Sequence, residues 1–155
     1  MLEARTHKQL KQLLLRHSSP WPHHLTLSRL VARSLRRQDH TLIQLDPSSK
    51  DLWWLGLLLP LCLEEHKAVM ILSEQQQRRL LNVELPMLQA EGFKLACWEG
   101  NVPPPGNQLW LMNPIELIEA HQQGQLKSRQ LIIPEAEHLS TRLRAAMALS
   151  ITYQD

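Results

Sequence analysis

Acidic residues follow an apolar run near the end of the 155-residue chain. The run Leu131–Ile133 leads through Pro134 to Glu135 and Glu137, and an amphipathic pattern then predicts a helix over 135–149. Carboxylates at a strand–helix junction can hold Mg²⁺ and orient a water for attack on a phosphate. They can equally be first-turn acids that favour a helix N-terminus. Glu135 is therefore a candidate catalytic residue with two possible roles.

A second candidate is the turn between a predicted strand, Thr41–Leu45, and an apolar helix from Asp51 to about residue 65. A phosphate-binding loop needs a strand, a glycine-rich turn, a Lys and a helix N-terminus. This turn has no glycine, and its proline lacks a backbone N–H. It could also be an ordinary strand–turn–helix with an Asp/Ser cap. The candidate ligand-binding residues are Ser48, Ser49, Lys50 and Asp51.

Metal and nucleophile chemistry find little support. Cys62 and Cys97 are isolated, with no CxxC or Cys/His spacing, so the sequence predicts no zinc site and no iron–sulfur cluster. His23 and His24 have no carboxylate or Cys near them in sequence and are interpreted as surface or capping residues. No Ser/His/Asp pattern stands out.

Composition indicates one soluble globular domain: 43% of residues are hydrophobic, 21% are charged and the net charge is +2. Four arginines crowd one predicted helix, which is either a solvated face or a weak site for single-stranded DNA: Arg29, Arg33, Arg36 and Arg37. The N-terminus lacks a signal-peptide pattern, and the apolar run 52–63 is too short to span a bilayer. We therefore expect a cytoplasmic protein without a membrane partner.

Strand-like apolar runs alternate with helical patterns along the chain. We predict strands at 41–45, 67–73, 93–98, 108–112 and 130–133. Such alternation is typical of an α/β fold with a parallel sheet of about five strands and helices on both faces. Ligands of such sheets bind at the carboxyl ends of the strands, so three loops matter most: 46–50, 99–107 and 134–138.

The order of several loose motifs carries a family resemblance. Trp21-Pro22-His23-His24 comes first, then Lys50, then Val69-Met70-Ile71-Leu72-Ser73, then Leu111-Met112-Asn113-Pro114, and finally Pro134-Glu135-Ala136-Glu137. This succession resembles the first motor domain of superfamily-two DNA helicases of the DinG/XPD type, and most of all their divergent cyanobacterial branch. The resemblance covers residues 20–150. It implies a three-layer, RecA-like domain of the P-loop NTPase kind.

The resemblance also implies roles. The adenine-reading position falls near His24 and the phosphate loop on 46–51. The phosphate Lys aligns with Lys50, with Asp51 as the alternative alignment. In the acidic box, Pro134 replaces the family's Asp while Glu135 and Ala136 match. ATP and Mg²⁺ are the implied cofactors, and single-stranded DNA, a second motor domain or another protein are the implied partners.

Two functional hypotheses follow from the altered motifs. In the first, residues 1–20 form an N-terminal helix, and residues 21–155 are a degenerate motor domain from a longer motor, weakly active or inactive alone. In the alternative, the chain is a non-catalytic binding or scaffold domain that reuses the motor fold.

Overall fold

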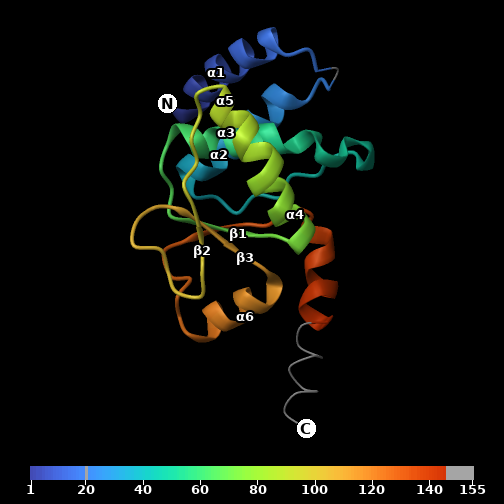
Figure 1. Ribbon diagram of the computed structural model, residues 1–155. Helices are drawn as coiled ribbons and strands as arrows, with labels where there is room; N and C mark the ends of the chain where they lie inside the picture. The colour runs from blue at the N-terminus through green and yellow to red at the C-terminus, as the bar shows by residue number, and fades with distance from the viewer. Residues whose placement is uncertain (20, 146–155) are drawn as a thin grey trace. The chain divides into compact units, whose positions relative to one another are not determined.

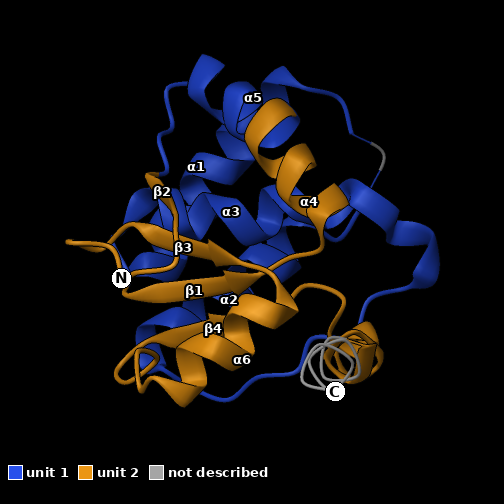
Figure 2. Ribbon diagram, turned by 60° about the horizontal axis from the view of Figure 1, so that its bottom comes forward, with its two compact units in different colours: residues 1–66, 83–95 blue, residues 67–82, 96–155 orange. Residues whose placement is uncertain are grey.

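The computed structural model describes residues 1–19 and 21–145 (Figure 1). These residues form two compact units (Figure 2). Unit 1 contains residues 1–66 and 83–95, and unit 2 contains residues 67–82 and the chain from residue 96 onward. The chain therefore passes from one unit to the other at residues 66/67, 82/83 and 95/96.

Unit 1 is helical. It contains α1 (Leu2–Arg16), α2 (His24–Arg37), a 3₁₀ helix (Pro47–Trp53), α3 (Trp54–Leu63) and α5 (Leu85–Ala90). Leucines at helical spacing on α1 pack against α3, as the sequence pattern predicts. The cluster consists of Leu10, Leu13 and Leu59, joined by the partly buried Leu14, Leu25, Leu55, Leu63 and Phe93.

Polar contacts also join the segments of unit 1. Arg36 of α2 donates from its Nε to both carboxylate oxygens of Glu3 on α1, at 2.8 and 3.0 Å. Arg16 and His17, at the end of α1, both pair with Glu91 in the segment that follows α5. The return segment 83–95 is thus tied to α1 by charge as well as by Phe93.

Unit 2 contains a parallel sheet of four strands in the order β2-β3-β1-β4. The strands are β1 (Ala68–Ile71), β2 (Cys97–Glu99), β3 (Leu109–Met112) and β4 (Gln130–Ile132). Every residue of β1 and β3 is buried, so both faces of these two strands are covered. Their continuous apolar runs predicted this.

The helices of unit 2 follow the strands. After β1 comes α4 (Glu74–Arg79), which continues into a π-helical turn (Leu80–Glu84), and after β3 comes α6 (Pro114–Gln122). One face of the sheet packs on α6 in a cluster of buried side chains: Val69, Ile71, Trp110, Met112 and Ala120. Pro114 occupies the first turn of α6, as expected. The chain is therefore α/β, with a parallel sheet flanked by helices.

A short proline-rich loop makes the crossover from β2 to β3. Parallel strands usually need a dozen or more residues between them. Residues 100–108 suffice here because β2 and β3 are only three and four residues long, so the return path along the sheet is short. Two indole N–H groups hold the loop: Trp98 donates to the carbonyl of Val102 at 2.9 Å and Trp110 to that of Gly100 at 3.0 Å.

Three expected elements differ from the structure. No strand forms at 41–45: residues 39–46 are irregular and Leu42 is 85% exposed. The rest of unit 1 is helical, so no strand within it offers a hydrogen-bonding ladder. The expected strand 93–98 is confined to Cys97–Glu99, because the backbone N–H of Phe93 instead donates to Leu88 at the end of α5.

The expected helix over 135–149 begins later. Glu135 has φ of 53°, a left-handed conformation that an α-helix cannot contain. A 3₁₀ turn (Ala136–His138) follows, and residues 139–145 are helical. The expected end at 149 lies outside the described residues. Among the helices that are described, none is both long and apolar enough to cross a membrane.

Candidate functional site

The turn predicted to hold phosphate is folded around its own carboxylate. Asp46 is the N-cap of the 3₁₀ helix Pro47–Trp53. One of its oxygens accepts from the backbone N–H of Ser48 at 2.8 Å and from the Ser48 hydroxyl at 2.6 Å. Its carbonyl accepts from the N–H of Ser49 at 2.9 Å. Hydrogen bonds from the Ser48 side chain and then its backbone lower the pKa of Asp46, so this carboxylate is charged at neutral pH.

This arrangement leaves the turn few donors for a phosphate. Pro47 has no N–H, and the next two amides point to Asp46. A bound phosphate would also lie beside a fixed negative charge. The residues of the turn therefore do not fit the triphosphate of Mg²⁺–ATP.

The remaining residues of the turn are placed as follows. Lys50 is exposed and has φ of 40°, which is unfavourable for any residue except glycine. Ser49 is buried, and its hydroxyl has no hydrogen-bond partner among the described residues. Asp51 accepts from the indole N–H of Trp54 at 3.3 Å, so its carboxylate anchors a core tryptophan.

His24 is a buried residue, which corrects the expectation of a surface or capping histidine. It is the first residue of α2, only 5% exposed, and neither it nor His23 caps the helix through its side chain. Its Nε2 lies 2.8 Å from the Ser19 hydroxyl oxygen. Its ring packs edge-to-face with that of Trp21, with the two ring centroids 4.8 Å apart. Burial lowers the pKa of His24, so the ring is neutral at pH 7.

His24 and the turn 46–51 both belong to unit 1. His23 lies within electrostatic range of Asp46, where it adds a small contribution to the lowered pKa of that carboxyl. Glu135 belongs to unit 2.

Glu135 follows β4 and is partly neutralised. Its carboxylate accepts from Arg142 at 3.3 Å. No side-chain hydrogen bond from Glu135 caps the 3₁₀ turn that follows it. Glu137 lies in the first turn of this 3₁₀ helix, which agrees with the alternative role of a first-turn acid, and Glu135 is paired with Arg142.

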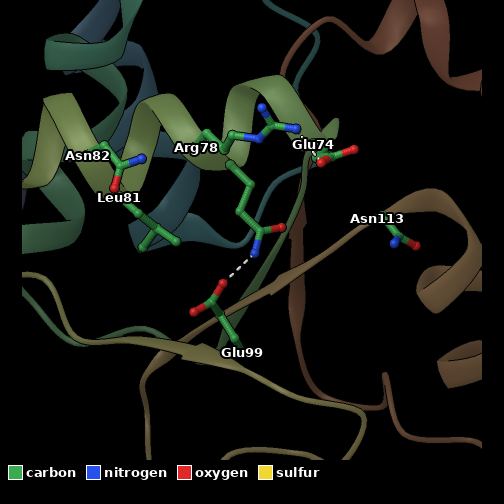
Figure 3. Close-up of a pocket in the computed structure, with 7 residues that line it drawn as sticks. Glu74, Arg78, Leu81, Asn82, Glu99 and Asn113 are labelled. Carbon is green, nitrogen blue, oxygen red and sulfur yellow. Dashed lines mark hydrogen bonds and ion pairs between the residues drawn. The ribbon is translucent and has the colours of Figure 1, made fainter.

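A pocket that sequence reasoning missed lies at the carboxyl ends of the strands of unit 2 (Figure 3). The chain leaves β1 toward β2 and leaves β3 toward β4, so the direction of the connections reverses between these adjacent strands. Open parallel sheets bind ligands at this point. The pocket has a volume of about 360 Å³, and all but one of its lining residues are of polar type: Glu74, Gln77, Arg78, Leu81, Asn82, Glu99 and Asn113.

Each charged group of the pocket has a partner within the pocket. Arg78 forms an ion pair with Glu74 one turn earlier on α4. Gln77 donates to Glu99 at 2.5 Å, which links α4 to the end of β2. Asn113 is the N-cap of α6. The expected loop 99–107 thus contributes Glu99, whereas the other lining residues lie outside the three loops singled out from the sequence.

One sequence signal could have located this pocket. Ser73 and Gln76, and likewise Asn113 and Glu116, form reciprocal capping boxes at the starts of α4 and α6. Both motifs are readable in the sequence directly after apolar strands. They place two helix N-termini at the same edge of a parallel sheet. Within residues 1–19 and 21–145, no three His, Cys, Asp or Glu side chains gather closely enough to hold a metal ion.

No protein-family model, curated protein or solved structure matches the chain.

Proposed function

We propose that the chain is a motor-like domain of the DinG/XPD helicase type whose nucleotide site is degenerate. Its contribution would be binding, to single-stranded DNA and to a second motor domain or another protein, rather than hydrolysis. The support is the order of the sequence motifs together with a parallel sheet flanked by helices. A three-layer RecA-like domain of about five strands, and a cytoplasmic location, are parts of this proposal.

The main support for a degenerate nucleotide site is that Asp46 already accepts the hydrogen bonds of the turn's amides. In a working phosphate loop, several backbone N–H groups converge on the anion. Here the N–H groups of Ser48 and Ser49 already donate to Asp46, and Lys50 is held in a strained backbone conformation. The same observation favours the second candidate, a scaffold domain that reuses the motor fold without any nucleotide.

Calorimetric titration with Mg²⁺–ATP tests the proposal. We expect a dissociation constant weaker than about 1 mM, which corresponds to a binding free energy of only about −4 kcal/mol. Micromolar binding by the unaltered chain would overturn the degenerate site.

The role of the internal carboxylate has its own test. Replacing Asp46→Ala frees the backbone N–H and the hydroxyl of Ser48 and removes a charge, so any residual affinity for inorganic phosphate should rise. Glu65→Ala removes an exposed carboxylate elsewhere in unit 1 and should leave phosphate affinity unchanged. An equal rise in both variants would mean that overall charge, and not the occupied turn, limits anion binding.

A further inference from the structure

The exposed face of α2 carries charge of one sign only. Leu27, Val31 and Leu35 are buried on its inner face. The helix contains no acidic residue, and its outer face presents four exposed arginines: Arg29, Arg33, Arg36 and Arg37. Unit 1 holds ten Lys or Arg against eight Asp or Glu, whereas unit 2 holds seven of each. The positive excess of the chain thus belongs to the unit that contains α2.

The four arginines are not equivalent. Arg36 is held by both oxygens of Glu3 and serves the contact between α1 and α2. Arg37 pairs with Asp39 at 3.3 Å, just beyond the helix. Arg29 and Arg33 form no hydrogen bond or ion pair within the described part of the chain. Two adjacent guanidinium groups are therefore available to a partner.

The spacing of these two arginines destabilises the helix when no partner is bound. Arg29 and Arg33 are four residues apart, about 6 Å along the helix axis, and therefore repel one another. Solvated helix faces usually mix both signs of charge, which avoids this repulsion. An external anion would remove it.

We propose that Arg29 and Arg33 form a binding site for the phosphate backbone of a nucleic acid. Guanidinium groups donate two parallel hydrogen bonds to a phosphate, and two of them one helical turn apart can engage successive phosphates. The site takes its class of partner from the proposed function, and its residues come from the ion pairs of α2. Binding should be independent of base sequence, because contacts to phosphate oxygens carry no information about the bases.

Fluorescence anisotropy with a labelled single strand of mixed sequence, measured over a range of salt concentrations, tests the site. The full chain should bind weakly at low salt, with a steep dependence on salt. Replacing both residues, Arg29→Gln and Arg33→Gln, should weaken binding by roughly tenfold or more at low salt. It should also reduce the slope of log affinity against log salt by about 1.4.

The matched control removes the same charge from α1. Lys8 and Lys11 are exposed on that helix, and Lys8→Gln with Lys11→Gln should change affinity far less. Far-ultraviolet circular dichroism should show unchanged helix content in both double variants, because all four side chains are exposed. Arg29→Lys with Arg33→Lys retains the charge and should retain most of the salt slope.

Three outcomes would overturn the site: no binding at low salt, equal losses in the α1 and α2 variants, or preferential binding of polyglutamate over the single strand. The last would assign the face to an acidic protein. Equal losses in the α1 and α2 variants would overturn the site alone, whereas no binding at low salt would also remove single-stranded DNA from the proposed function. Micromolar binding of Mg²⁺–ATP contradicts the degenerate nucleotide site and leaves the anisotropy result unaffected.

Discussion

Single residues decide what the predicted phosphate turn can do. The carboxylate of Asp46 occupies the Ser48 amide, which would otherwise be free to bind an anion, and Lys50 adopts a positive φ that glycine would adopt at no cost. The lack of glycine in the turn was readable from the sequence. The use of Asp46 as an internal ligand was not, because a side chain that accepts from a nearby amide looks the same in sequence as one that points to solvent.

Lys50 should be a site of stored strain. Replacing Lys50→Gly should raise the free energy of unfolding by about 1 kcal/mol, because glycine tolerates φ of 40°. Urea unfolding measures the change. Lys8→Gly on α1 is the control: it places glycine within a regular helix and should lower stability by about 1 kcal/mol. Destabilisation by both changes would show that Lys50 is unstrained.

Buried histidines should make stability depend on pH. Burial lowers the pKa of His24, and it lowers that of His66 against a smaller opposing effect of Glu64. The unfolded chain, where both groups titrate near pH 6.5, therefore binds protons at a higher pH than the folded chain does. Unfolding takes up protons in this range, so stability is full above about pH 6.5 and falls as pH decreases below it.

We expect a lower melting temperature at pH 5.5 than at pH 7.5. His24→Asn should flatten this dependence, whereas His7→Asn, at an exposed position, should not. Glu3, Asp46 and Glu91 have lowered pKa values, so their stabilising contribution is lost only at more acidic pH, below about 4. A melting temperature that stays constant down to pH 5 would contradict the effect of the histidines.

At the scale of elements, the sequence was most informative where burial and periodicity agree. The strands β1 and β3, the leucine face of α1 and the helix from residue 74 to residue 90 follow directly from their patterns. Gly92, with φ of 87°, ends that helix as predicted. The hydrophobic pattern gave a wrong prediction at 41–45, where a run of β-prone residues has no neighbouring strand in unit 1 to form hydrogen bonds with. It also failed at Glu135, whose left-handed backbone delays the helix.

The capping boxes at the sheet edge should support both the fold and the pocket. Replacing Asn113→Ala removes the acceptor for the Glu116 amide at the start of α6 and should lower stability by about 1 kcal/mol. Asn107→Ala makes the same chemical change in an exposed loop of unit 2 and should stay within about 0.5 kcal/mol of the original stability. Thermal unfolding of the two variants side by side provides the measurement. Equal losses would mean that the cap contributes little.

At the scale of the whole molecule, neither unit is a continuous stretch of chain. The sequence predicted a helical N-terminal segment followed by one domain. Nothing in composition marks residues 83–95 as part of the earlier helices, because the contacts that bring the segment back are long-range. Phe93 packs beside Leu10 and Leu59, and Glu91 pairs with Arg16 and His17.

A substitution at Phe93 tests how much the return segment 83–95 stabilises unit 1. Phe93→Ala should lower the free energy of unfolding by about 2 kcal/mol, below the full cost for a buried ring because Phe93 is only partly buried. Lys94→Ala changes the exposed neighbour and should be nearly neutral. If the two variants unfold at the same urea concentration, the segment does not complete the cluster.

Because the chain alternates between the two units, the parts of unit 1 are not synthesised in one continuous stretch. The helices α1, α2 and α3 leave the ribosome first, but Phe93 and Glu91 emerge only after β1 and α4, which belong to unit 2. At about 5–20 residues per second, the nascent helices wait a few seconds for the segment that closes their cluster. During that interval β1, an apolar strand without its neighbours β3 and β4, has also been released. Nascent chains of this length are therefore the species that most need protection from aggregation.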